Sequence, residues 1–448
     1  MDLRHILVAF IIAAEASLAG ISYTPITTGA TESAQKLYNF LATNYGTKTV
    51  SGVQTGELSF SDDLTSQPDL LAVDTVSGKY PALVGFDFLF ATGINASTSW
   101  YQQYTNKTLS LAIELWNAGG IPAFSWHWKD PSDSVDEFYV EGANDTYTTF
   151  DFTNAFKSGT TDWDSTSETF TQITSDIDEI AAYFQTLQDS GVAAIFRPLH
   201  ECGGTWFWWN DQTAEQYAAL YRLVYTRMTE TDGIKNLVWV WNPQKSIFTK
   251  ADWNPGSDYY DIISVDIYNN ANNNKSNSSV FESMGTNYGT DKIFALSENG
   301  PIPDVSLMHT DSAVWSWWMP WYESWSGGFV SKTADSVWTS NMADDRIITL
   351  DKMPGWDKYI VGIEKDAEIR PILSSRVEEN NILISLPTSG TANIAIFNIQ
   401  GNQVTSLNKG NIDAGTHSFT LTGLSRGYYV LRATGSFGSL VLPLQIRE

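Results

Sequence analysis

Short apolar runs recur along residues 49–319 and alternate with segments whose apolar positions lie three and four residues apart. The apolar runs are typical of buried strands, and the three- and four-residue spacing is typical of amphipathic helices. The pattern therefore predicts strand–helix units around a parallel sheet. The eight predicted strands are TVSGVQ (49–54), PALVGFDF (81–88), IPAFSWHW (121–128), AAIFRPLHE (193–201), NLVWVWNP (236–243), DIISVDIY (261–268), KIFALSENG (292–300) and AVWSWWM (313–319).

Helices are predicted between several of these strands. Residues 32–45 and 176–190 carry apolar side chains at helical spacing, and Thr213 with Gln216 can form a capping box that opens another helix. Eight strands alternating with helices over about 300 residues predict an α/β fold, a (β/α)8 TIM barrel. An open doubly wound sheet is the alternative, but no glycine-rich phosphate fingerprint follows the first strand.

The pattern changes after Trp356. Residues 360–380 are charged and linker-like, and short alternating strands then follow over 381–448, separated by Gly, Asn and Ser. The sequence therefore predicts a barrel domain over 20–359, a linker, and a small all-β sandwich. The expected strands of the sandwich lie in ILISLP, ANIAIFNIQG, THSFTLTG, GYYVLRATG and SLVLPLQI.

The N-terminus has the pattern of a secretory signal. Arg4 and His5 precede the apolar run 6–14, and small residues at Ser17 and Ala19 come before Gly20. A signal peptide over 1–19 is expected, with a buried first helix as the alternative. The run is too short to span a bilayer, so we expect a secreted or cell-surface protein with no membrane span.

Charge and cysteine content narrow the choice of partners. A formal net charge of −25 disfavours nucleic-acid phosphates and anionic lipids, whereas a neutral polysaccharide is compatible with it. Cys202 is the only cysteine, and the pair His200-Glu201 is followed by Cys-Gly-Gly, so there is no H-E-x-x-H zinc helix. We expect no cofactor and no metal, and a monomer.

Polar and aromatic residues end the predicted strands. In a (β/α)8 barrel these positions converge on one face, where active sites of this fold lie. Two of them are carboxylic acids, Glu201 after the fourth strand and Glu298 at the seventh, which face each other across a barrel mouth. The others are Asp87, Trp126 to Trp128, His200, Asn242, Asp266, Tyr268, Trp317 and Trp318.

Two carboxyl groups on opposite sides of a bond are what glycoside hydrolysis requires. Glu201 lies beside His200 and Trp206, where burial raises a carboxyl pKa, which suits a general acid. Glu298 suits the nucleophile, with Tyr268 donating a hydrogen bond to it. His127 is a candidate sugar contact. A lone glutamate could instead be a helix cap or a solvated charge. His127 and Tyr268 could instead be core residues.

The motifs RPLHE (197–201), WFWW (206–209) and SENG (297–300) resemble glycoside hydrolase family 26, which contains many endo-β-1,4-mannanases. The similarity extends over residues 31–356 and includes DDRIITLDKMPGW (344–356). The resemblance implies a retaining mechanism on a (β/α)8 barrel, with Glu201 as acid/base and Glu298 as nucleophile. It implies sugar contacts from His200 and Trp206 and, more loosely, from His127, Tyr268 and Trp318.

The hypotheses for function differ in substrate and in chemistry. The resemblance favours a retaining endo-β-1,4-mannanase acting on mannan, glucomannan or galactomannan. Cys202-Gly203 stands where mannanases usually have Met-Asn, so a β-glucanase or xylanase of the same fold stays open, as does a barrel that binds glycans without cleaving them. The tail resembles C-terminal sorting domains of the type IX export machinery, with a carbohydrate-binding module as its alternative.

Overall fold

The computed structural model describes residues 21–324, 328–359 and 361, and most of 374–446. The C-terminal gaps are at 379–380, 387–388, 399–401, 414, 422–423 and 436–437. The described chain divides between a unit within 18–361 and a unit within 362–448. The predicted signal peptide lies outside the described residues.

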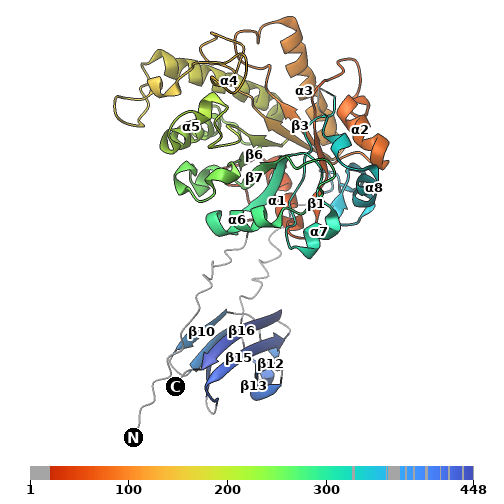
Figure 1. Ribbon diagram of the computed structural model, residues 1–448, viewed down its shortest axis with the longest axis vertical. Helices are drawn as coiled ribbons and strands as arrows, with labels where there is room; N and C mark the ends of the chain where they lie inside the picture. The colour runs from red at the N-terminus through yellow and green to blue at the C-terminus, as the bar shows by residue number, and fades with distance from the viewer. Residues whose placement is uncertain are drawn as a thin grey trace. The chain divides into compact units, whose positions relative to one another are not determined.

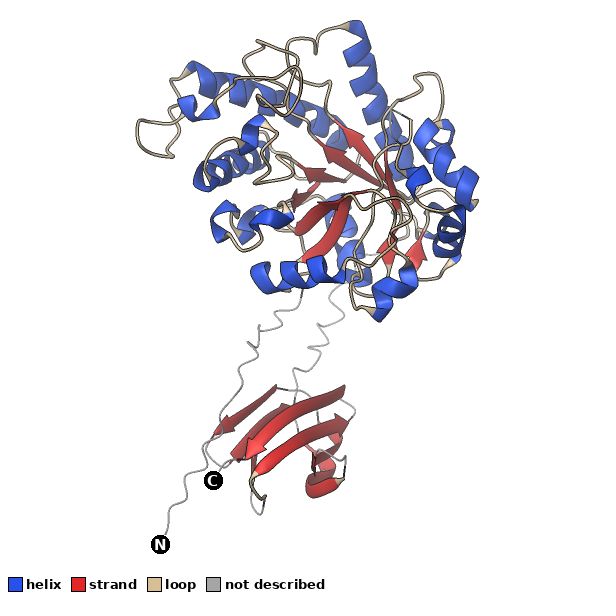
Figure 2. Ribbon diagram, viewed as in Figure 1, coloured by secondary structure: helices blue, strands red, loops and turns tan. Residues whose placement is uncertain are grey.

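Seven parallel strands form the sheet of the larger unit, and each pairs with the next in chain order. Figure 2 shows them at the centre of the unit with helices around them. The (β/α)8 barrel predicted from the sequence is confirmed. The strands are β2 (Gly52–Gln54), β3 (Leu83–Asp87), β4 (Ile121–Ser125), β5 (Ala194–Arg197), β6 (Leu237–Trp241), β7 (Ile262–Ile267) and β8 (Ile293–Asn299).

The segment predicted as the eighth strand, 313–319, closes the barrel without forming a regular strand. Trp317 makes an isolated bridge to Val50 and Pro320 makes one to Asn299, so the segment lies between the two ends of the sheet. The first predicted strand is also split. Its beginning, β1 (Thr49–Val50), pairs with β9 (Ile347–Ile348), whereas β2 pairs with β3. The pairing partner of the predicted first strand therefore changes between β1 and β2, so the strand is not continuous.

Helices cover the outside of the barrel (Figure 1). Thr31 caps α1, and Thr213 and Gln216 form the predicted capping box of α5. The helix predicted over 176–190 is longer, because it begins at Glu168, eight residues before its expected start, where Ser167 caps it. The helices are α1 (Glu32–Asn44), α2 (Pro68–Ser77), α3 (Ser99–Asn117), α4 (Glu168–Asp189), α5 (Ala214–Thr226), α6 (Ser278–Tyr288), α7 (Val305–Thr310) and α8 (Asp335–Ala343).

The barrel strands are buried along their whole length, as expected where helices cover one face of a parallel sheet and side chains fill the other. Much of this core is aromatic: Trp126, Trp239 and Trp241 are fully buried. A packed interior of this kind leaves the ends of the strands as the place for polar chemistry. No helix among the described residues has the length and apolarity needed to cross a membrane.

The smaller unit consists of two antiparallel sheets, ordered β10-β11-β14 and β13-β12-β15-β16. Ile384 of the first sheet and Ile394 and Leu431 of the second share one apolar cluster, which makes the unit a β-sandwich. The strands are β10 (Ser374–Glu378), β11 (Asn381–Leu386), β12 (Gly390–Asn398), β13 (Gln403–Ile412), β14 (Gly415–Thr420), β15 (Gly427–Gly435) and β16 (Gly438–Ile446).

Two of these strands differ from the sequence prediction. β10 lies inside the segment expected to be a linker, and it pairs in register with β11 from Ser374 opposite Ser385 to Glu378 opposite Asn381. β13 was not predicted. It is mostly polar and half-exposed, so it lacks the alternation that marks a strand, and its pairing with β12 contains two irregularities.

Candidate active site

Three carboxylates meet at the carboxyl ends of the barrel strands. Asp266 and Glu298 end β7 and β8, and Glu201 follows β5. One oxygen of each lies within 4.8 Å of one oxygen of each of the others. Retaining glycosidases hold their two carboxyl groups about 5–5.5 Å apart and inverting ones about 6.5–9.5 Å, so this cluster has the closer spacing.

Arg197, the last residue of β5, compensates part of this negative charge. Its guanidinium is 3% exposed and contacts both Asp266, at 3.0 Å, and Glu298. Its pKa is raised because the two carboxylates outweigh the effect of burial. Charge-assisted hydrogen bonds from one buried arginine hold both acids in place, although burial still raises the pKa of Asp266 to about 7.

Glu201 has a different environment. Burial raises the pKa of its carboxyl group well above the usual range, and the charges of Asp266 and Glu298 raise it further. Trp206 donates its indole N–H to Oε2 at 2.5 Å, and Gln244 donates to Oε1 at 3.2 Å. Neither neighbour carries a positive charge, so no direct contact offsets the effect of burial, and Glu201 keeps its proton at neutral pH.

The backbone around Glu201 is held in an unusual conformation. Leu199 and Glu201 have φ of 48° and 55°, a left-handed region that side chains other than glycine rarely adopt. The amide of Glu201 donates to Asn242 Oδ1 at 2.7 Å, and Asn242 also donates to Asp266 at 2.9 Å. One asparagine at the end of β6 therefore fixes the backbone of Glu201 and the side chain of Asp266 together.

Tyr268 lies on the other side of the cluster. Its hydroxyl donates to Glu298 Oε2 at 2.5 Å, while Arg197 occupies Oε1. The pKa of Tyr268 is raised by loss of hydration and by the charge of Glu298, so the phenol keeps its proton and remains a donor. Both oxygens of Glu298 thus accept from a donor, which holds the carboxyl group in one orientation.

His127 and His200 form a pair beside the cluster. His127 Nδ1 is 2.5 Å from Asp87 Oδ2, and its Nε2 is 3.2 Å from His200 Nε2. Burial lowers the pKa of His127, but the Asp87 carboxylate more than offsets this and raises it overall. Burial, Arg197 and His127 lower the pKa of His200. A cationic His127 can donate both to Asp87 and to Nε2 of a neutral His200, whereas the buried Nδ1 of His200 has no hydrogen-bond partner among the described residues.

Most of the predicted site residues therefore gather in one place, but Trp318 does not. Its side chain is 0% exposed and lies in the core, so it offers no surface to a substrate. The expected sugar contact at Trp318 is corrected on that ground. Trp321, three residues further, is partly exposed, and its ring centroid is 5.9 Å from that of His127.

The structure also explains Cys202-Gly203. Cys202 is fully buried, and its backbone N–H and C=O bond to Asn242 and Gln244, at 2.9 Å each. Gly203 has φ of 79°, and a Cβ there would lie 2.5 Å from Ile247 Cγ2. Ile247 thus fills the space that a side chain at position 203 would take, which accounts for the glycine there.

Several residues of the site were named too weakly or not at all by sequence reasoning. Arg197, Asp266 and Asn242 lie at or beside strand ends, and that position was the available signal for each. Gln244 and Trp321 lie in loops, where no periodicity marks a residue that faces the site.

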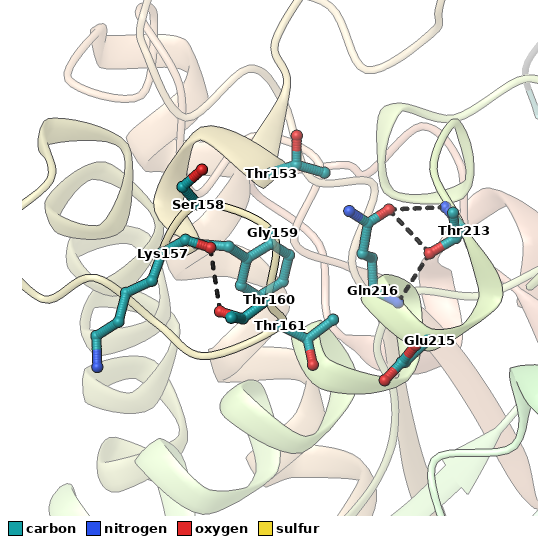
Figure 3. Close-up of a pocket in the computed structure, with 10 residues that line it drawn as sticks. Thr153, Lys157, Ser158, Gly159, Thr160, Thr161, Thr213, Glu215 and Gln216 are labelled. Atoms are coloured by element: carbon teal, nitrogen blue, oxygen red, sulfur yellow. Dashed lines mark hydrogen bonds between the residues drawn. The ribbon is translucent and has the colours of Figure 1, made fainter.

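A separate cavity of about 410 Å³ lies outside this cluster. It opens between the loop after β4 and the start of α5 (Figure 3). Its lining contains none of the three carboxylates. The lining residues are Thr153, Phe156, Lys157, Ser158, Gly159, Thr160, Thr161, Thr213, Glu215 and Gln216.

A (β/α)8 barrel with closely paired glutamates at its strand ends has the architecture of the barrel glycoside hydrolases. The comparison with known families gives the same class. The model of glycosyl hydrolase family 26 matches residues 26–368, and the chain belongs to that family.

Named relatives agree in fold and sequence. The chain is 34% identical to a β-mannanase from a symbiotic protist of the termite Reticulitermes speratus, solved with a gluco-manno-oligosaccharide. The match covers 75% of this chain and 99% of that one, with a TM-score of 0.66.

Two curated relatives are named mannan endo-1,4-β-mannosidases. The chain is 34% identical to one from Thermothelomyces thermophilus over 72% of its own length and 62% of the relative's. It is 32% identical to mannan endo-1,4-β-mannosidase B of Piromyces sp over 75% of its own length and 54% of the relative's. The chain thus spans a little over half the length of these relatives.

Proposed function

We propose that this protein is a retaining endo-β-1,4-mannanase that hydrolyses mannan-type plant polysaccharides. Glu201 is its general acid/base and Glu298 its nucleophile. His127, His200, Trp206 and Tyr268 contact the sugar or the two glutamates. The names of the relatives, all mannanases, support the choice of substrate.

The different surroundings of the two glutamates carry this proposal. Glu298 is held by Arg197 and Tyr268 and is suited to attack, whereas the raised pKa of Glu201 keeps a proton available for the leaving group. A carboxylate positioned for attack and a second carboxyl group that can supply a proton are what double displacement requires.

In the first step, Glu298 attacks the anomeric carbon of the bound sugar and Glu201 protonates the glycosidic oxygen. The bond between that oxygen and the anomeric carbon breaks, the shortened chain leaves as an alcohol, and the sugar is held as an ester of Glu298. Tyr268 and Arg197 keep the attacking oxygen in place, so little reorganisation is needed in the transition state.

In the second step, Glu201 acts as a base. Esterification removes the negative charge of Glu298, which is one cause of the raised pKa of Glu201. That pKa therefore falls in the intermediate, and the Glu201 carboxylate can take a proton from water as the water attacks the anomeric carbon. The Glu298 ester breaks and the β-configuration is restored.

The substrate is tested by reducing-sugar release from soluble mannan, xylan and mixed-linkage glucan. We expect activity mainly on mannan. Preference for xylan or glucan would replace the substrate in this proposal. If the intact protein bound mannan but did not cleave it, the barrel would be a glycan-binding module instead.

The roles of the glutamates are tested with two substrates. Glu201→Ala should lose hydrolysis of mannan, whose leaving group needs a proton, but should still form the glycosyl-enzyme from an aryl glycoside with a good leaving group. Glu298→Ala should lose both activities by several orders of magnitude because the nucleophile is absent. The reverse pattern would exchange the two roles.

We also propose that the protein is exported and acts as a monomer. The apolar N-terminal run and the resemblance of 381–448 to sorting domains support secretion through a leader and an export machinery that reads the tail. A neutral polysaccharide too large to enter a cell is a substrate for a secreted or cell-surface enzyme. Export is tested by measuring the protein outside the cells of its native host. We expect the full chain to be found there and a chain without the tail to be absent.

A further inference from the structure

An exposed aromatic group lies at the start of α3, outside the carboxylate cluster. Trp100 is 45% exposed, although it is one of the largest apolar side chains in the protein. Its ring packs edge-on to Phe90, with centroids 4.9 Å apart, and lies 5.5 Å from Tyr104 and 6.0 Å from Phe60. The ring is thus fixed by neighbours from two loops and its own helix while much of it stays open to solvent.

The position of this group relates it to the active site. α3 follows β3, so its first turn lies on the side of the barrel where the strands end, which is the face that carries the carboxylates. Phe60 belongs to the loop that leaves β2 on the same face. Trp100 is therefore on the side of the mouth formed by β2 and β3, across the barrel from β6, whose following loop supplies Gln244 to Glu201.

Aromatic residues continue from Trp100 toward the carboxylates. Tyr104 donates to the carbonyl of Gly56 at 2.6 Å, and a Cβ at Gly56 would lie 2.7 Å from the ring of Tyr322. Tyr322 is 5.3 Å from Trp321, which in turn lies beside His127. Tyr322 and Trp321 are both partly exposed. The row from Trp100 to Trp321 thus ends beside His127, next to the carboxylate cluster.

A second connection holds Trp100 at a constant place. Its neighbour Tyr101 donates to Asp136 at 2.5 Å, and Lys129 Nζ lies 2.7 Å from Asp136 and 4.5 Å from the centre of the Tyr101 ring. Lys129 and Asp136 belong to the loop after β4, which also carries His127. A platform tied to the same loop as a site residue keeps its spacing from the site, as a substrate subsite must.

We propose that Trp100, supported by Phe60 and Phe90, is a distal subsite that stacks on a sugar ring of a long β-linked chain whose scissile bond lies at Glu201 and Glu298. Pyranose rings present C–H faces that pack on aromatic rings, and the indole N–H of Trp100 can donate to a hydroxyl. The proposal rests on the proposed function, because the occupant is a neutral polysaccharide already bound at the carboxylates.

Trp100→Ala tests the subsite. We expect KM for soluble galactomannan to rise about tenfold, equivalent to about 1.4 kcal/mol, with kcat nearly unchanged. Hydrolysis of an aryl β-mannobioside, too short to reach the platform, should stay at the wild-type rate. Tyr23→Ala is the matched control. Tyr23 is 54% exposed but lies near Ile26, whose amide bonds to Asp261 at the amino end of β7.

Two further measurements keep the outcomes separate. Trp100→Leu preserves apolar contact with Phe90 and Tyr104 but has no flat ring, so it should raise KM for the polymer even if Trp100→Ala unfolds. Equal KM for galactomannan in wild type, Trp100→Leu and Tyr23→Ala would overturn the subsite. If the wild-type protein did not act on mannan at all, the proposed function would fail instead.

Discussion

Glu201 and Glu298 are the same residue type, and their neighbours give them different environments. Glu298 faces Arg197 and a phenol, whereas Glu201 faces an indole, an amide and the charge of two other acids. The charge of Asp266 is the largest electrostatic cause of the raised pKa of Glu201. The pH range in which Glu201 is an acid should therefore depend on Asp266.

Asp266→Asn tests this dependence. Removing a negative neighbour stabilises ionised Glu201 and lowers its pKa, so the protonated form is lost at a lower pH. We expect the alkaline limb of kcat/KM to move down by about one pH unit, alongside a fall in activity because Arg197 loses a partner. Asp261→Asn is the control. Asp261 is buried just before the amino end of β7, whereas Asp266 lies near the carboxyl end of that strand, where the cluster is. An unmoved alkaline limb in Asp266→Asn would contradict the assignment.

At the scale of elements, the loop that carries Trp321 and Tyr322 is held by one residue of α2. The buried carboxylate of Asp69 accepts hydrogen bonds from the amides of Glu323 and Ser324, from the Ser324 hydroxyl and from the amide of Gly56, at 2.7–2.9 Å. Four donors on one carboxylate join the loop after β2 to the loop after 313–320. Asp69 is therefore a positioning residue for the rings beside the site.

Asp69→Asn should loosen this junction. An amide nitrogen cannot accept, so at least one backbone N–H is left without an acceptor, at a cost of about 1–3 kcal/mol in the free energy of unfolding. We expect a lower denaturation midpoint and a higher KM for mannan, because Trp321 is less well held. Asp63→Asn is the control, since Asp63 is an exposed cap and asparagine caps as well. A normal KM together with lower stability would limit Asp69 to a structural role.

At the scale of the whole molecule, the family match and the larger unit end close together, at residues 368 and 361. The β-sandwich has its own apolar cluster, from Ile384 to Ala433. Each unit therefore has what a domain needs to fold alone. The tail can serve export or binding without contributing to the carboxylate cluster, all of whose members lie in the larger unit.

Deleting residues 369–448 should leave kcat and KM on soluble mannan within about twofold of the full chain, since the barrel keeps its core and site. Secretion in the native host should fail, which is measured by the amount of enzyme outside cells. Loss of activity on insoluble mannan alone would instead indicate that the sandwich is a carbohydrate-binding module. Loss of activity on soluble mannan would mean that the two units depend on each other.

Local pattern was sufficient for most of the elements. The strands β3 to β8 lie within the predicted runs, because a parallel strand buried on both faces is a continuous apolar run. The segment 313–319, β10 and β13 were harder, since their pairing depends on distant partners and not on their own alternation. Trp318 was misplaced because a tryptophan at a strand end can face the core or the site, and the sequence does not distinguish the two; Trp317 and Trp318 are both buried.

The sequence by itself determined the class of fold, the family and the strand-end positions of the two glutamates, since strand ends of a (β/α)8 barrel converge on one face and their residue types can be read directly. The tertiary structure decided which acid keeps its proton. That difference arises from Arg197, Asp266 and Tyr268, which come from different strands and meet Glu298 only when the barrel closes. Charge interactions and burial act through space, over a few ångströms, and a linear pattern does not contain those distances.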